Sequence, residues 1–231
     1  MAGPMVSRRQ VVGLLAVSPL VAAATAAQAV DLALVLAIDC SLSVDETEFQ
    51  LQLRGTSQAV LDSAFLQVME QGANRKIAIS AFLWSNPKSQ QVIVPWRILD
   101  SAHGAMAVAD EILSARRTIA SGATATGDAL AFASRLLEQA PAAERRVVDA
   151  STNGPANMGK PVRIERDGVL ALGATINGLA VGTKGGNLKR YLEENVTGGP
   201  GSFVIEAPDF NAYTLAIRLK LFREVAGSVS A

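Results

Sequence analysis

Three side chains that carry oxygen alternate along one short segment of the sequence. Asp39, Ser41 and Ser43 are separated by single residues and follow an apolar run at 32–38. An extended turn directs alternate side chains to the same side, so the three oxygens can converge on one point. Magnesium prefers an octahedron of oxygen ligands and usually keeps several waters, so one carboxylate and a few hydroxyls suffice. The spacing therefore predicts a weakly bound divalent cation: Mg²⁺, or else Mn²⁺ or Ca²⁺.

Two further polar loops precede or follow regular elements and can add ligands. Gly122-Ala123-Thr124-Ala125-Thr126-Gly127-Asp128 leads into a helical segment and offers the hydroxyl of Thr124, while Ser151-Thr152-Asn153-Gly154 follows an apolar strand and offers Asn153. Each candidate also has a structural reading. Ser43 fits a helix cap, Thr124 a turn or cap, and Asn153 before Gly154 a turn pair. Asp128 suits the positive end of its helix.

Strands and helices alternate along the chain. The run at 32–38 reads as a central parallel strand buried on both faces, and 44–69 reads as a helix opened by a capping box at 43–46. The remaining expected elements are a strand pair at 77–83 and 92–94, helices at 105–116 and 127–139, strands at 147–151, 175–181 and 202–205, and a final helix from the cap Asp209 to Ala226. This order predicts an α/β fold, a doubly wound, mostly parallel sheet with helices on both faces. In such sheets ligands bind beyond the carboxyl ends of the strands, where we expect Asp39 to point into solvent.

The first 29 residues read as an export signal. Arg8 and Arg9 precede an uncharged apolar run, and Ala27-Gln28-Ala29 offers a small-x-small cleavage site. Ser7-Arg8-Arg9-Gln10-Val11-Val12 also resembles a twin-arginine motif, which exports folded domains. An uncleaved membrane anchor is the alternative reading, although the apolar run is shorter than a span needs. We therefore expect a leader at 1–29 and one mature domain at 30–231, periplasmic or secreted by a bacterium.

Composition narrows the function further. The chain has 21 basic and 21 acidic residues and no basic cluster that could track a phosphate backbone, so nucleic acid is not expected as a partner. Cys40 is the only cysteine and reads as a small buried side chain. His103, the only histidine, falls in a predicted loop, and neither a catalytic triad nor a zinc-hydrolase set can be assembled around it. Trp84 and Trp96 read as core or sheet-edge anchors.

The three loops together resemble a known metal site. Asp-x-Ser-x-Ser after a buried strand, Gly-x-Thr-x-Thr-Gly before a helix, and a later strand followed by x-x-Gly are similar to the metal-ion-dependent adhesion site of von Willebrand A domains. The resemblance implies that Asp39, Ser41, Ser43 and Thr124 are metal ligands. Asn153 stands where that family has a second aspartate, which is a departure. In the family pattern an acidic side chain of a protein partner often completes the coordination.

Two later segments resemble a narrower group. Gly173-Ala174-Thr175-Ile176-Asn177-Gly178-Leu179-Ala180 and Gly198-Gly199-Pro200-Gly201-Ser202-Phe203 are similar to exported bacterial proteins with a von Willebrand A-like domain and no assigned function. The leading hypothesis is thus an exported, metal-dependent protein-binding module without enzymatic activity. A metal-free scaffold with a degenerate site is the first alternative. A metal-assisted hydrolase is the second, and it lacks an evident general base beside the cation.

Overall fold

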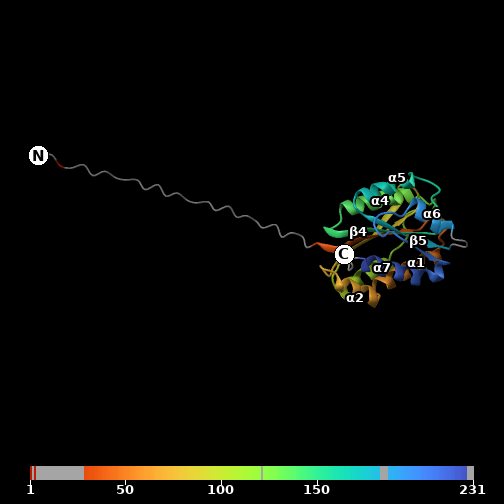
Figure 1. Ribbon diagram of the computed structural model, residues 1–231, viewed down its shortest axis with the longest axis horizontal. Helices are drawn as coiled ribbons and strands as arrows, with labels where there is room; N and C mark the ends of the chain where they lie inside the picture. The colour runs from red at the N-terminus through yellow and green to blue at the C-terminus, as the bar shows by residue number, and fades with distance from the viewer. Residues whose placement is uncertain (2, 4–28, 121, 183–186, 228–231) are drawn as a thin grey trace.

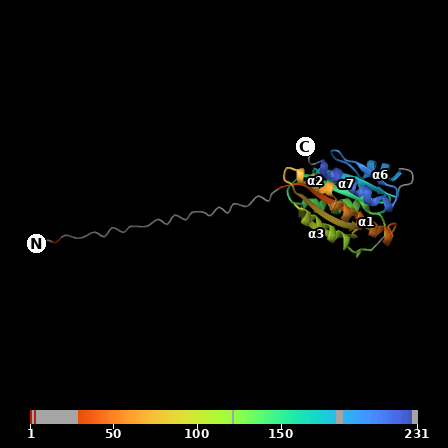
Figure 2. The same cartoon turned by 90° about the horizontal axis from the view of Figure 1, so that it is seen from below.

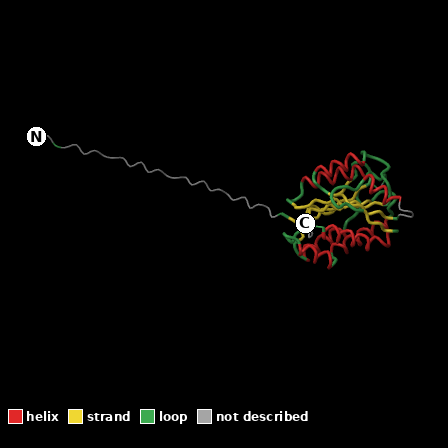
Figure 3. The backbone as a smooth tube through the Cα atoms, in the orientation of Figure 1, coloured by secondary structure: helices red, strands yellow, loops and turns green. Residues whose placement is uncertain are grey.

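The computed structural model describes residues 1, 3, 29–120, 122–182 and 187–227. Within these ranges a sheet of six strands lies between two layers of helices (Figures 1 and 3). In sheet order the strands are β3 (Gln90–Leu99), β2 (Ile77–Trp84), β1 (Val30–Asp39), β4 (Ala143–Thr152), β5 (Thr175–Val181) and β6 (Val204–Ala207). The predicted fold class is confirmed. Residues 2 and 4–28 of the predicted leader lie outside the described ranges.

The central strand β1 determines where the site forms. It pairs in parallel with β2 on one side and β4 on the other, and all ten of its residues are buried. An apolar strand of this kind must be covered on both faces, as the sequence predicted. Only β3 runs antiparallel, as the partner of β2 in the expected strand pair. The carboxyl ends of β1 and β4 therefore meet at one edge of the sheet, which we call the crest.

Each face of the sheet carries its own apolar core. On one face α1 (Glu46–Val60), α2 (Ser63–Gln71), α3 (Ala102–Leu113) and α7 (Tyr213–Ala226) pack together, and Figure 2 views the molecule from that side. On the other face lie α4 (Thr126–Glu138), α5 (Val162–Ala171) and α6 (Asn187–Asn195). Asp209 caps a 3-10 turn (Phe210–Ala212) that leads into α7, and α7 ends at Ala226 with Gly227 as its C-cap, as predicted.

The first helix differs from its prediction in two ways. Its N-cap is Asp45, whose carboxylate accepts from Glu48 N while the Glu48 carboxylate accepts from Asp45 N. The capping box assigned to Ser43 is therefore wrong, and the Ser43 side chain has another role. The predicted helix over 44–69 is in fact two helices. The first ends at Val60, and the second begins at Ser63 with the side chain of Asp62 as its N-cap.

Other boundaries were shifted or missed. The strand β3 is longer than the predicted 92–94, and the helices α5 and α6 were not predicted at all. His103 lies in the exposed first turn of α3 and not in a loop. Within the described ranges, no helix is both long and apolar enough to span a membrane.

Candidate metal site

All five predicted site residues meet at the crest. Asp39 is the last residue of β1, Ser41 and Ser43 follow it, Thr124 precedes α4, and Asn153 follows β4. The Ser41 backbone N–H donates to the Asp39 carboxylate, and the Ser41 hydroxyl lies within hydrogen-bond distance of the hydroxyls of Ser43 and Thr124. The Ser43 hydroxyl in turn donates to Asn153. Segments that are far apart in the sequence thus place a carboxylate, three hydroxyls and an amide in one cluster.

Asp39 forms the buried base of this cluster. Its side chain is fully buried, so the expectation that it points into solvent is wrong. One carboxylate oxygen accepts from the Ser41 backbone N–H at 2.8 Å, and the other accepts from the Thr152 hydroxyl at 2.5 Å. Burial raises the pKa of Asp39, and the hydrogen bonds from Thr152 and Ser41 oppose that rise. Each oxygen keeps a further lone pair that can bind a cation.

The hydroxyls and the amide form a continuous chain above Asp39. Ser41 Oγ lies 3.2 Å from Ser43 Oγ and 3.5 Å from Thr124 Oγ1. Ser43 Oγ donates to Asn153 Oδ1 at 2.7 Å, and Asn153 Nδ2 donates to the Ser43 carbonyl at 3.0 Å. Ser41 and Thr124 are buried, whereas Ser43 is exposed and Asn153 is half-buried. The cluster is therefore accessible from the side of Ser43 and Asn153.

Three supporting residues were missed by sequence reasoning. Thr152 holds the Asp39 carboxylate, as described above. Gln52 Nε2 on α1 donates to the Asp39 carbonyl at 3.0 Å. Arg117 donates to the carbonyls of Cys40 and Val44, at 3.2 and 3.1 Å, and thereby fixes the loop that carries both serines. The one signal that could have indicated Thr152 is the pairing register of β1 with β4. Ile38 pairs with Ser151, so the residues that follow them, Asp39 and Thr152, lie side by side.

The oxygen spacing suits a small cation. With metal–oxygen distances of about 2.0–2.1 Å, neighbouring ligands of an octahedron lie about 2.9 Å apart. The Ser41–Ser43 and Ser41–Thr124 separations are slightly longer than this. The described residues contain no group of three or more His, Cys, Asp or Glu side chains that could hold a metal. The ligands at the crest are accordingly one carboxylate and several neutral oxygens. Hard oxygen donors with one negative charge fit Mg²⁺ or a similar ion held with modest affinity.

The remaining candidate residues have structural roles. Cys40 is buried, donates to the Trp84 carbonyl at 3.4 Å, and has its pKa raised to about 12, chiefly by burial. Trp84 is buried in the core, and Trp96 Nε1 donates to Leu136 O at 3.0 Å, as expected of core and sheet-edge anchors. Asp128 lies in the first turn of α4 and accepts from the Lys160 backbone N–H.

Solved structures of von Willebrand A type resemble this fold. Proximal thread matrix protein 1 of the mussel byssus, in a structure with a zinc-occupied MIDAS motif, matches 86% of this chain and 48% of its own, at 17% identity and a TM-score of 0.63. The match to the pilus adhesin SpaC of Lactobacillus rhamnosus GG covers 84% of this chain and 30% of the adhesin chain, at 13% identity and a TM-score of 0.61. The match to a von Willebrand factor type A protein of Catenulispora acidiphila covers 87% of this chain and 43% of that protein, at 18% identity and a TM-score of 0.56. The chain thus spans about half or less of each neighbour.

A family model identifies the chain more narrowly. No curated protein matches the sequence. The model of a protein of unknown function, DUF1194, matches residues 29–229, which is nearly the whole of the chain beyond the predicted leader. The strand order, the crest cluster and the solved neighbours agree on the wider architecture. The chain belongs to the DUF1194 family and has a von Willebrand A-like fold.

Proposed function

We propose that this protein is an exported protein-binding module that docks its partner through a divalent cation at the crest. The observation that carries the proposal is the single hydrogen-bonded cluster of Asp39, Ser41, Ser43, Thr124 and Asn153. In this proposal these residues hold Mg²⁺, Mn²⁺ or Ca²⁺, which supplies a positive charge with open coordination positions. A carboxylate of a protein partner then occupies an open position.

The surroundings of the cluster favour docking by a protein. Leu42 lies between the two serines of the loop and is 75% exposed, although it is a large apolar side chain. Its backbone N–H donates to the Gly122 carbonyl at 2.8 Å, so the loop holds this side chain at the crest. An acidic side chain on the cation and an apolar contact on Leu42 would together fix the partner's position.

Known proteins of this fold lend the proposal general support. One neighbour is a pilus adhesin, and another has zinc in its adhesion-type motif. The first alternative remains a scaffold that binds no metal, because the site has one carboxylate. The second, a metal-assisted hydrolase, requires a general base beside the cation, a role that no residue of the cluster other than the hydrogen-bonded Asp39 could fill.

Calorimetric titration of the protein with Mg²⁺, Mn²⁺ and Ca²⁺ tests the proposal. We expect one saturable site for at least one of these ions. Binding of an envelope protein that is lost with a chelator and restored by the same ion would support the docking role. Absence of binding by all three ions would favour the metal-free scaffold. Turnover of a generic ester or phosphoester that depends on the ion would favour the hydrolase.

We also propose that residues 1–29 direct export by the twin-arginine route. Replacing Arg8 and Arg9 together by lysine keeps the positive charge but removes the paired guanidinium groups, so we expect the precursor to accumulate inside the cell. Fractionation and immunoblotting would measure this, and mass spectrometry of the exported form would locate the cleavage expected after Ala29. Unchanged export of the double variant would reject the twin-arginine route and leave general secretion.

A further inference from the structure

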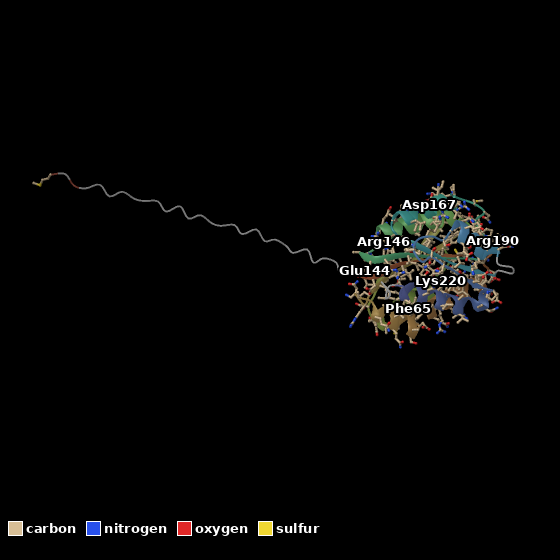
Figure 4. All side chains as sticks on the ribbon, in the orientation of Figure 1. Phe65, Glu144, Arg146, Asp167, Arg190 and Lys220 are labelled. Carbon is tan, nitrogen blue, oxygen red and sulfur yellow. The ribbon has the colours of Figure 1, made fainter. Side chains whose placement is uncertain are left out.

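A pocket lined by charged residues lies at the opposite end of the sheet from the crest. It has a volume of about 580 Å³ and is bounded by the beginnings of β4 and β5, the loop before β6, and the end of α7. Figure 4 shows Glu144 and Arg146, two of its lining residues, at the end of the molecule where β1 begins. A volume of this order accommodates a small molecule.

Three arginines line this pocket, Arg145 and Arg223 beside α7 and Arg146 on the other face of the sheet. Arg145 donates to the Glu224 carbonyl and Arg146 to the Leu172 carbonyl, each at 3.1 Å. The Arg223 guanidinium stacks on the Phe203 ring, 3.9 Å from its centroid. In the described parts of the chain, none of the three forms an ion pair. Arginines of this kind are available for an anionic ligand, which they bind through paired N–H donors.

Two buried polar atoms next to the pocket also lack partners. The Nε of Arg146 is buried and has no hydrogen-bond partner among the described residues, and the same holds for Oε2 of Glu224. Such atoms are rare in folded proteins because each carries a desolvation cost. Burial also lowers the pKa of Arg145, and the nearby Glu224 carboxylate opposes that shift, so an anion in the pocket would further favour the charged form. Both unpartnered atoms have almost no exposed surface, so a ligand in the pocket would be held by the half-buried Arg145 and the exposed Arg223 instead.

The buried residues around Glu224 hold its carboxylate in place. Lys220 on α7 is fully buried and pairs with Glu224 at 2.7 Å and with Asp149 at 2.6 Å. Asn177 Nδ2 donates to Glu224 Oε1 at 3.0 Å, and Asn177 Oδ1 accepts from the Phe203 backbone N–H at 3.1 Å. One network thus positions both the carboxylate and the ring that supports Arg223.

We propose that this pocket binds the phosphate group of a small molecule through Arg145 and Arg223, the two arginines beside α7. A phosphate dianion offers oxygens to both guanidinium groups and a charge for each, which a singly charged carboxylate does less well. The pocket has room beyond a single phosphate ion, so the ligand can carry further groups. Inorganic phosphate and a phosphorylated small molecule share this chemistry, and the affinities of the two distinguish them.

Titration with inorganic phosphate, glycerol 3-phosphate and glycerol tests the assignment. The protein is kept in EDTA and constant sodium chloride, so the result is independent of any cation at the crest. We expect saturable binding of at least one phosphate compound at one site and none of glycerol. Tighter binding of glycerol 3-phosphate would assign a phosphorylated molecule as the ligand, and tighter binding of inorganic phosphate would assign the free ion.

Variants of single arginines locate the binding. Arg223→Gln and Arg145→Gln should each weaken binding about tenfold, since each removes charge-assisted hydrogen bonds. Arg97→Gln is the matched control, because Arg97 lies on β3 at the other edge of the sheet and pairs with Glu111. Thermal unfolding would verify that all three variants are folded. Failure of both phosphate compounds to bind, or an equal effect of the control, would overturn the proposal.

Discussion

Replacing Asp39 by asparagine is expected to weaken Mg²⁺ binding by roughly a hundredfold or more while the domain remains folded. Asp39 supplies the only carboxylate of the crest cluster, so the variant leaves neutral ligands alone. Asparagine preserves the local hydrogen bonds, because its oxygen can accept from Ser41 N and its amide can donate to the Thr152 hydroxyl. Calorimetry with Mg²⁺ measures the loss of binding.

The stability of the metal-free protein distinguishes this variant from a disruptive one. Burial raises the pKa of Asp39, which means that its ionised form carries a desolvation cost in the folded state. We therefore expect the Asp39→Asn variant to unfold, in EDTA, at the same or a higher temperature than the natural protein. Asp39→Ala should instead lower the free energy of unfolding by about 1–3 kcal/mol, because Ser41 N and the Thr152 hydroxyl lose their acceptor.

Asp45→Asn is the matched control for the loss of one negative charge. Asp45 lies near the cluster, is exposed, and caps α1, a position where asparagine is about as favourable as aspartate. We expect its Mg²⁺ affinity to stay close to that of the natural protein. If Asp45→Asn and Asp39→Asn weaken Mg²⁺ binding equally, the overall negative charge near the crest, and not coordination by Asp39, governs the affinity for Mg²⁺.

Sequence reasoning located the crest because strong local patterns define it. The apolar run before Asp39 predicts a strand buried on both faces, and alternation places Asp39, Ser41 and Ser43 on one side. Loops that follow neighbouring parallel strands must meet at one edge, so the Asn153 loop could be assigned to the same place. The Thr124 loop joins two helices and was assigned to the crest by the resemblance to von Willebrand A domains. The sequence did not indicate how deep each side chain lies, and Asp39 was therefore wrongly expected to face solvent.

The missed helices have few buried apolar residues. Only Val169 is buried on α5, and only Leu188 and Leu192 on α6. Helices with so narrow an apolar stripe give little periodic signal. The pocket with three arginines escaped prediction for a different reason. Its residues come from β4, α7 and the loop before β6, and no local spacing relates them.

The second large effect is expected at Asn153, where this chain has an amide and the resemblance to von Willebrand A domains implies a second aspartate. Asn153→Asp should tighten Mg²⁺ binding about tenfold, or about 1.4 kcal/mol, because the added charge attracts the cation. Any cation bound by the natural protein should depend more on the partner's carboxylate, so the cation and the partner should each strengthen binding of the other. Titration of both proteins with Mg²⁺ measures the first effect.

The hydrogen bonds of Asn153 predict a distinct cost for this gain. Its Nδ2 donates to the Ser43 carbonyl at 3.0 Å, and in the aspartate variant a carboxylate oxygen faces that carbonyl instead. Two acceptors then repel each other, and the metal-free variant should unfold at a lower temperature than the natural protein. Added Mg²⁺ should reverse the order, since a ligand that binds the folded state stabilises it.

Asn153→Ser provides the matched comparison, because it removes the amide without adding charge. We expect it to lose the contacts with Ser43 and to gain no affinity for Mg²⁺. Because Gly154 follows Asn153, intact mass should be checked before titration, so that deamidated protein does not contribute the charge under test. If unaged natural protein and Asn153→Asp bind Mg²⁺ equally, Asn153 lies outside the coordination sphere. In that case the lone carboxylate of Asp39 would have to hold the cation with hydroxyls and water.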